Sequence, residues 1–305
     1  MMRKRWVKAL SAILLALALG GCASNPVLST PTPAPSAENT GPPSTGQLEF
    51  QLIGADGNNN AYDQKLVVPI EDSPLKGKVI YWLGSSVTYG SGSNGQSMAQ
   101  FMAAADGVTS VVEAVSGTTL ATPPEGGENS YVSRLLNGEK FSKDDKVDLF
   151  VCQISTNDCK QANLAAMGEL TADDMIELEQ FDLATAIGSI EYLIRYVHDT
   201  WGCPIYFYSG AFFGDGDDGL RVNDNPCGSD YEKLVNLALA AAEKWNKQDG
   251  YRVNVLDLFH DEGFNNLVSD SDYAYLMRDA IHPRKAGYLI WWLPEFQEAF
   301  YQEFS

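Results

Sequence analysis

The stretch VIYWLGSSVTYGSGSN, residues 79–94, joins an apolar run to two adjacent serines and a glycine-rich polar turn. The run from Val79 to Leu83 has the length and composition of a buried strand, and it stops at Gly84. Small and polar residues therefore begin where a parallel strand would leave its sheet. This position raises the question of whether either serine hydroxyl reacts.

From residue 79 onward, short apolar runs alternate with longer helical patterns. The expected strands are VIYWLG from 79, TSVVEAV from 109, VDLFVCQI from 147, PIYFYSG from 204 and VNVLDLF from 253. Helices are expected at 96–105, 130–137, 182–200 and 229–246, with a final helix that has Pro283 in its first turn and a bend at Pro294. Because right-handed crossovers cover both faces of a sheet, the alternation predicts an α/β fold: a three-layer α/β/α sandwich around a five-stranded parallel sheet, in the flavodoxin-like order 2-1-3-4-5.

Three strand ends carry small or hydrogen-bonding residues. Gly84-Ser85-Ser86 follows the first strand, Ser116-Gly117 the second, and Ser155-Thr156-Asn157-Asp158 the third. In the expected order the first strand lies between the other two, so these loops converge where ligands bind in such sheets. A hydroxyl, a glycine N–H and a carboxamide are the parts of an acyl-transfer site.

A serine hydroxyl needs a base, and the chain has three histidines. We expect a structural role for His198 near the end of a helix and a place at the site's rim for His260. His282 differs because Asp279 precedes it by three positions and Pro283 favours an extended backbone there. A carboxylate at that spacing can fix the imidazole tautomer, although a surface Asp with a capping His would give the same pattern.

Taken together, these blocks resemble the SGNH, or GDSL-type, hydrolases. That family carries Gly-Asp-Ser after the first strand, a lone Gly after the second, Gly-x-Asn-Asp after the third and Asp-x-x-His near the C terminus. Here they correspond to Gly84-Ser85-Ser86, Gly117, Ser155-Thr156-Asn157-Asp158 and Asp279 to His282, in the family's order, over about residues 79–293.

The resemblance implies an esterase with Ser86 as nucleophile, His282 as general base and Asp279 as its orienting carboxylate. It implies an oxyanion hole formed by the backbone N–H groups of Ser86 and Gly117 and the Asn157 amide, and it implies no metal and no cofactor. The strand pattern alone does not choose between the serines, because it breaks at Gly84.

Two positions depart from the family pattern. Ser85 stands where the family has Asp, and Ser155 replaces the Gly of the third block. Neither supplies the nucleophile or a triad partner, so we expect activity to survive with altered turn geometry. Thr88 occupies the second glycine position of a G-x-S-x-G elbow, which disfavours the α/β-hydrolase fold.

For the substrate we expect short acyl groups, such as acetyl, on an extracellular carbohydrate. The insert 159–180 and the loop 208–231 are expected to wall the site, where Tyr208, Phe212 and Phe213 could stack on sugars or simply fill the core. A lipase or thioesterase, and a non-catalytic ligand-binding lipoprotein on the same fold, are the alternatives.

The N-terminal 47 residues predict export. Residues 1–21 combine a basic start with a short apolar run and read as a lipoprotein signal peptide, because LGGC resembles a lipobox with Cys22 as the lipid attachment site. An ordinary secretory signal is the alternative. Residues 22–47 form a Pro/Ser/Thr-rich tether and 48–305 the hydrolase domain, so we expect a cell-surface protein anchored to a bacterial membrane by lipid. A net charge of -19 disfavours nucleic acid as a partner.

The cysteines and the acidic loops give predictions about disulfide bonds and metal sites. Four cysteines remain after Cys22; Cys152 is expected in the core, and of the three pairings possible among Cys152, Cys159, Cys203 and Cys227 we favour a Cys203–Cys227 bridge. Acidic loops from Asp56 and Asp215 lack the closing ligands of an EF-hand, so no metal site is expected there. Segments 48–54 and 64–70 could pair as an edge ribbon.

Overall fold

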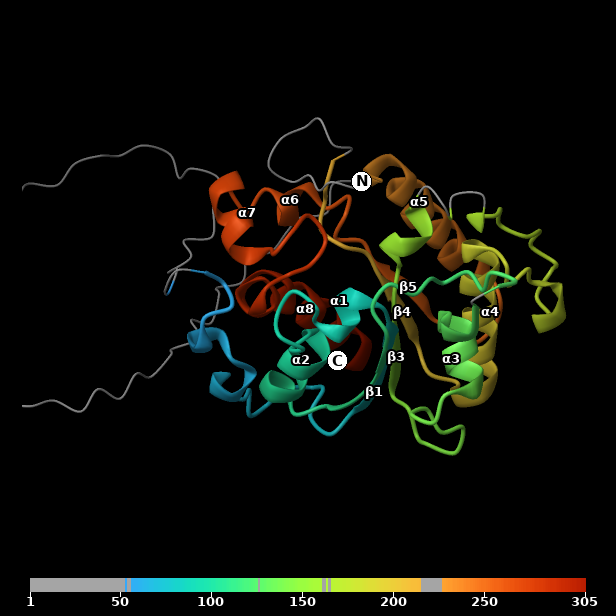
Figure 1. Ribbon diagram of the computed structural model, residues 1–305. Helices are drawn as coiled ribbons and strands as arrows, with labels where there is room; N and C mark the ends of the chain where they lie inside the picture. The colour runs from blue at the N-terminus through green and yellow to red at the C-terminus, as the bar shows by residue number, and fades with distance from the viewer. Residues whose placement is uncertain (1–52, 54–55, 126, 161–162, 164–165, 215–226) are drawn as a thin grey trace, which may run out of the picture. The chain divides into compact units, whose positions relative to one another are not determined.

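The structure is a computed structural model that describes residues 53, 56–125, 127–160, 163, 166–214 and 227–305 (Figure 1). The described residues belong to one compact unit, Gln47–Ser305. The predicted signal peptide, the lipid attachment site at Cys22, the tether and the acidic loop from Asp215 lie outside the described residues. Among those that are described, no helix is both long and apolar enough to cross a membrane.

The central sheet has the predicted strands in the predicted order, β2-β1-β3-β4-β5, all parallel. The strands are β1 (Val79–Gly84), β2 (Thr109–Ala114), β3 (Leu149–Gln153), β4 (Ile205–Tyr208) and β5 (Val253–Leu256). Gly84 pairs with Ala114 of β2, and Leu83 pairs with Cys152 of β3. The fold-class prediction is therefore confirmed, and the ends of β1, β2 and β3 lie side by side.

Helices cover both faces of the sheet (Figure 1). Along β1, Tyr81 and Leu83 face one core cluster, which they share with α3 (Tyr131–Asn137), α4 (Ala186–Trp201) and α5 (Gly228–Trp245). Ile80 and Trp82 face the other cluster, with α2 (Met98–Asp106), α6 (Glu262–Asn265), α7 (Asp270–Leu276) and α8 (Leu293–Phe304). Alternate side chains of one buried strand thus fill two separate cores, which is why the run is apolar throughout.

Short helical turns make up much of the rest. They are α1 (Ser86–Tyr89) and the 3-10 turns η1 (Asn60–Tyr62), η2 (Gln64–Leu66), η3 (Gly127–Asn129), η4 (Thr156–Cys159) and η6 (Leu178–Gln180). The four longer helices expected between the strands are present as α2 to α5. Side-chain caps mark two of their starts, because Ser130 accepts from Ser133 N and Thr185 accepts from Gly188 N.

The end of the chain differs from expectation. Pro283 does not open the final helix; it forms an antiparallel bridge with Met277. The helical path instead includes a π-helical segment, η7 (Gly287–Trp292), directly before Pro294, which occupies the first turn of α8. Pro294 has no N–H and so cannot donate the usual hydrogen bond to the helical turn before it. A π-type turn at this place therefore gives up no hydrogen bond from residue 294.

The expected edge ribbon is wrong for the part that is described. The side chains of Asn59 and Asp63 accept hydrogen bonds from the backbone N–H groups of Ala61 and Lys65, and these local bonds turn the chain into η1 and η2 instead of a strand. The partner segment 48–52 lies outside the described residues.

The expected Cys203–Cys227 bridge is also wrong, since none of the four described cysteines is in a disulfide. Cys203 lies just before β4, at the amino edge of the sheet, whereas Cys227 caps α5, which follows the carboxyl end of β4. The two thiols therefore belong to opposite edges of the sheet. Cys152 is fully buried on β3, as predicted.

Candidate active site

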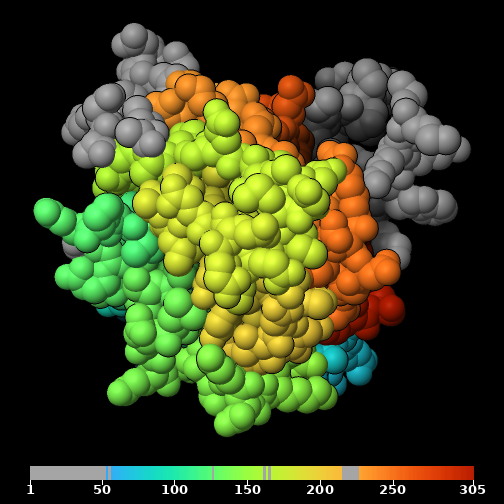
Figure 2. Space-filling view, turned by 90° about the vertical axis from the view of Figure 1, so that its right-hand side faces the viewer, coloured from blue at the N-terminus to red at the C-terminus, as the bar shows by residue number. Residues whose placement is uncertain are grey.

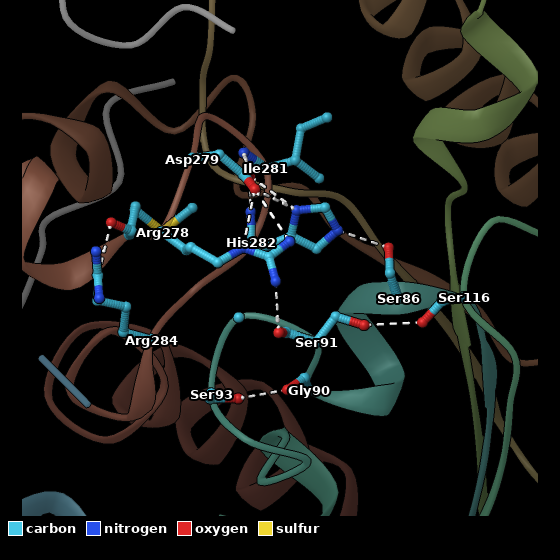
Figure 3. Close-up of polar contacts among 12 residues, drawn as sticks. Ser86, Gly90, Ser91, Ser93, Ser116, Arg278, Asp279, Ile281, His282 and Arg284 are labelled. Atoms are coloured by element: carbon cyan, nitrogen blue, oxygen red, sulfur yellow. Dashed lines mark hydrogen bonds and ion pairs between the residues drawn. The ribbon is translucent and has the colours of Figure 1, made fainter. Parts of the chain in front are cut away.

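The two adjacent serines after β1 have different environments. Ser85 is fully buried, and its Oγ accepts a hydrogen bond from Asn157 Nδ2 at 3.4 Å. Ser86 opens α1, is only partly buried, and its Oγ lies 2.7 Å from Nε2 of His282 (Figure 3). Accessibility and contact with a base both distinguish Ser86 from its neighbour.

The close approach of α1 to the end of β1 depends on Gly84. A Cβ at this position would lie 1.8 Å from Thr88 Oγ1, so a larger residue would displace the first turn after the strand. Thr88 is itself fixed, because its N–H and hydroxyl donate to Gln153 Oε1 at 3.1 and 2.9 Å. The same oxygen accepts from Ser85 N at 3.0 Å. Gln153, at the end of β3, therefore organises the turn that presents Ser86.

His282 and Asp279 lie on a tight turn that follows α7. Nδ1 of His282 lies 2.8 and 2.9 Å from the two carboxylate oxygens of Asp279, and Oδ1 also accepts from the backbone N–H groups of Ile281 and His282 at 2.9 Å (Figure 3). Arg278 N donates to His282 O at 2.8 Å and closes the turn. The sequence spacing predicted this Asp–His contact, and the contact is present.

These hydrogen bonds stabilise the anionic form of Asp279. Partial burial would raise the pKa of its carboxyl, but the hydrogen bonds from the His282 side chain and the nearby backbone N–H groups outweigh it. The pKa of Asp279 consequently lies well below its ordinary value of 3.8. Asp279 is therefore anionic near neutral pH.

The three expected oxyanion donors come from loops that touch one another. Ser86 contributes the first N–H of α1, and Gly117 lies at an exposed turn with φ +84°, a conformation that favours glycine. Among the described residues no acceptor contacts either N–H group. Asn157 is buried, and its Nδ2 donates to Thr118 O at 2.9 Å, which joins the third loop to the second.

Two charged residues that sequence reasoning gave no role organise these loops. Arg134 of α3 is buried and donates to the carbonyls of Gly84 and Glu113 at 2.8 and 3.0 Å and to Glu113 Oε1 at 3.2 Å. Asp158 is buried and accepts from the backbone N–H groups of Leu120 and Ala121 at 2.9 and 3.0 Å. Burial raises the pKa of Asp158 to about 6 although those bonds oppose the rise. For Arg134, a charge between the apolar residues Val132 and Leu135 of a short helix was the available signal.

The segment before the sheet contacts two parts of the site. Asn58 Nδ2 donates to Gly92 O at 2.9 Å, and Asn58 Oδ1 accepts from Lys285 N at 3.1 Å. The buried Lys285 ammonium lies 3.1 Å from Asp63 Oδ2. A hydrogen bond from Gln96 is the main cause that lowers the pKa of Asp63 to about 2. Residues 56–66 thus connect the loop after Ser86 to the turn after His282.

The other two histidines lie apart from this hydrogen-bonded group. His198, near the end of α4, stacks on Tyr251 with ring centroids 3.9 Å apart. His260 Nδ1 lies 2.7 Å from Asp257, and its ring lines a pocket of about 640 Å³ together with Phe212.

Of the three aromatic residues that could either contact substrate or fill the core, Tyr208 and Phe213 are buried, and Phe212 is 41% exposed. The acidic loop from Asp56 uses its side chains for local contacts: Asp56 accepts from Asn58 N, and Asn59 caps η1. Within the described ranges, no group of three acidic, histidine or cysteine side chains could hold a metal ion.

Comparison with known proteins agrees with this fold. No family model matches the sequence, and no curated protein matches it. One solved structure aligns over 75% of this chain and 98% of its own length with a TM-score of 0.54 and 21% identity, which shows a shared fold.

Two further solved structures are less similar. A structure described as a possible lipase from Chitinophaga pinensis aligns over 74% of this chain and 98% of its own, with a TM-score of 0.48 and 16% identity. An acetylxylan esterase from Geobacillus stearothermophilus aligns over 76% of this chain and 96% of its own, with a TM-score of 0.46 and 15% identity.

Proposed function

We propose that the protein is a serine esterase that hydrolyses carboxylic esters. The observation that carries the proposal is the unbroken chain of contacts from Ser86 Oγ to His282 Nε2 and from His282 Nδ1 to Asp279. A hydroxyl, an imidazole and an anionic carboxylate in this order form the arrangement that turns a serine into a nucleophile.

In the proposed reaction, Ser86 Oγ forms a bond to the ester carbonyl carbon while its proton passes to His282 Nε2. The carbonyl π electrons move to oxygen, and the oxyanion accepts hydrogen bonds from the N–H groups of Ser86 and Gly117 and from the Asn157 amide, whose long 3.4 Å bond to Ser85 Oγ is exchanged for the one to the oxyanion. The C–O bond then breaks, and the alcohol leaves with the proton from His282. Water attacks the acyl-serine along the same path in reverse, which releases the acid and restores the Ser86 hydroxyl.

Asp279 acts on the imidazole and not on the substrate. Its carboxylate accepts from Nδ1, so Nε2 is the nitrogen left to receive the serine proton. It also stabilises the imidazolium that forms in each half of the reaction. The lowered pKa of Asp279 keeps this carboxylate charged for both tasks.

For the substrate we propose short acyl groups, such as acetyl, on a carbohydrate. Two pockets of about 640 and 430 Å³ lie elsewhere, the first beside Phe212 and His260 and the second beside Met167 and Lys233. Tyr89 of α1 is 53% exposed three residues after Ser86, and the hydroxyls of Ser91 and Ser116 lie nearby. An open, polar surface with an exposed ring suits a glycan that carries a small ester.

The test is ester hydrolysis by the chain from residue 48 onward, with p-nitrophenyl acetate, butyrate and palmitate as substrates. We expect Ser86→Ala to abolish turnover and Ser85→Ala to retain it, with acetate preferred over palmitate. Turnover that survives Ser86→Ala and is lost in Ser85→Ala would overturn the nucleophile. The absence of turnover on every ester would favour a ligand-binding protein, and a preference for palmitate would favour a lipase.

The carbohydrate part of the proposal needs its own measurement. Acetate release from acetylated xylan, acetylated chitooligosaccharides and acetylated glucose distinguishes a glycan esterase from a general one. We expect release from at least one polymer with a higher kcat/KM than from p-nitrophenyl acetate. Equal or lower values on all glycans would leave an esterase of another substrate class.

We further propose that the protein is exported and held at the cell surface by lipid on Cys22. The support is the sequence pattern at residues 1–22 and the Pro/Ser/Thr-rich residues that follow. A tethered esterase at that location would meet extracellular polymers, which agrees with a glycan substrate.

A further inference from the structure

We propose that Arg278 is a positioning residue of this site: its guanidinium ties the Asp279 carboxylate to the loop that follows Ser86. The inference rests on the proposed esterase function. It adds a residue that neither the resemblance nor the triad geometry assigns.

The contacts of Arg278 reach two separate parts of the site (Figure 3). Its Nη1 donates to the backbone carbonyl of Ser91 at 2.6 Å. Its Nε and Nη2 both lie 3.2 Å from Asp279 Oδ2, on the side of the carboxylate away from the two backbone N–H groups. One planar guanidinium therefore fixes the distance between the histidine's carboxylate and the loop that leaves α1.

The loop that Arg278 holds is connected in turn to the Gly117 turn. Ser91 Oγ lies 2.8 Å from Ser116 Oγ, one residue before Gly117 (Figure 3). The next residue, Gly92, packs directly on the histidine, since a Cβ there would lie 2.4 Å from Pro283 O and 2.9 Å from His282 O. Residues 91–92 thus lie between the histidine turn and an oxyanion donor, and Arg278 sets their position.

The position of Arg278 indicates an effect on rate rather than on stability. Its side chain is 43% exposed, and exposed ion pairs contribute little to the free energy of unfolding. The carboxylate that it contacts, however, must stay oriented within a few tenths of an ångström for proton transfer. Loss of the guanidinium should therefore free Asp279 to rotate and the Ser91 loop to shift while the fold is kept.

Arg284 provides a matched control in the same stretch of chain. Its Nε donates to Met277 O at 3.1 Å, and no hydrogen bond or ion pair to Asp279, His282 or the Ser91 loop occurs among the described residues (Figure 3). Arg284→Met removes the same charge as Arg278→Met, six positions away, without removing the contact under test.

The kinetic test compares Arg278→Met, Arg278→Lys and Arg284→Met in the full chain, purified in detergent, with p-nitrophenyl acetate. We expect R278M to lower kcat about tenfold with KM within about twofold of wild type, because small displacements of catalytic groups act mainly on kcat. R278K should recover part of the loss, since an ammonium reaches only one of the two acceptors. R284M should keep the wild-type kcat, and an equal loss in R284M would overturn the proposal.

A second readout does not depend on turnover. The Nδ1 proton of His282, hydrogen-bonded to Asp279, should give a low-field proton NMR signal that His282→Gln removes. We expect this signal to shift or broaden in R278M and to stay in place in R284M. A signal that is unchanged in R278M, or missing in wild type, would overturn the role of Arg278. If the wild type hydrolysed no ester, the proposed function would fail, and the NMR comparison would still decide whether Arg278 holds the pair.

Discussion

Asn157 shows how one side chain can serve the turn geometry and the proposed chemistry together. Its Nδ2 donates hydrogen bonds to Thr118 O and to Ser85 Oγ. These bonds connect the third loop to the second and to the first. Arg134, Gln153 and Asp158 surround this point with buried polar contacts.

Replacement of Asn157 tests the amide directly. We expect Asn157→Ala to lower kcat about a hundredfold with a small change in KM, because an oxyanion donor acts mainly in the transition state. Steady-state kinetics with p-nitrophenyl acetate measures this, with the exposed Asn266→Ala as a control for amide loss elsewhere. A fall in kcat of less than about threefold would remove Asn157 from the oxyanion hole.

Asp158 gives a pH dependence of stability with a definite sign. Its pKa is about 6 in the folded chain against an ordinary 3.8, so the folded state loses stability relative to the unfolded one as pH rises from about 4 through 6. Asp158→Asn cannot titrate. The free energy of unfolding of wild type minus that of the variant should therefore decrease by about 3 kcal/mol over this range.

Urea unfolding at pH 4, 5, 6 and 7 provides the measurement for Asp158. Asp144→Asn, at an exposed carboxylate, is the matched control. Stability curves of wild type and D158N that run parallel across the range would contradict the raised pKa.

At the scale of elements, the insert after β3 is fastened by a buried ion pair. Residues 166–180 lie over α4 in the space-filling view, as yellow-green atoms above yellow ones (Figure 2). Lys244 of α5 and Glu191 of α4 are buried with Nζ and Oε1 2.6 Å apart. Both bond Thr171, and Lys244 also donates to Met175 O at 3.0 Å. Two helices and the insert therefore share one charge pair.

Removal of one partner should expose the cost of a buried unpaired charge. We expect Lys244→Met to lower the free energy of unfolding by about 3 to 5 kcal/mol and K244M/E191L to recover much of it. The exposed pair of Lys247 with Asp173 offers a control, because Lys247→Met should cost less than about 1 kcal/mol. Chemical denaturation of the three variants decides; equal losses in K244M and K247M would contradict the burial argument.

The elements differ in how far the sequence predicts them. The three inner strands, β1, β3 and β4, are buried almost throughout and are therefore recognisable as apolar runs. The edge strands β2 and β5 are only partly buried and include polar residues, so they were recognised from their place in the strand–helix alternation, and the strand order was expected from the flavodoxin-like topology. The segment before β1 was not predictable, because side-chain contacts such as Asn59 to Ala61 N compete with strand pairing and leave no periodicity. The π-helical segment before Pro294 was not predicted for a different reason, since a π turn and an α-helix share one sequence pattern.

Some residues of the candidate site were also predictable from the sequence, and others were not. The Asp279–His282 spacing predicts their contact, which is present, while the catalytic roles of these residues stay predictions. Choosing Ser86 needed the resemblance, because alternation ends at Gly84; the structure adds that Ser85 is buried. Arg278 and Asn58 could not be found from sequence, since their partners lie 187 and 227 positions away in the chain.

At the scale of the whole molecule, the acidic composition and the predicted export signal bear on the proposed location. A chain with net charge -19 gains no attraction from anionic lipid, so the proposed membrane attachment relies on a covalent lipid and not on a basic patch. This makes Cys22 the single point on which the proposed location depends.

Substitution of Cys22 tests that location. We expect Cys22→Ser to move the protein from the membrane fraction to the soluble fraction in a bacterial host, with ester hydrolysis per molecule unchanged. Cell fractionation, with mass spectrometry of the mature N terminus, measures both parts. A variant that stays in the membrane fraction would contradict lipid anchoring at this residue.

The bridging role of Asn58 has a practical consequence for defining this domain. A recombinant chain trimmed to begin at Val79 would keep every strand of the sheet and look complete by topology. It would nevertheless discard Asp63 and leave the buried ammonium of Lys285 without its counter-ion, three residues from the imidazole. Counting strands would therefore set the boundary too late, because residues 56–78 contribute both buried side chains such as Tyr62 and Leu75 and the counter-ion of Lys285.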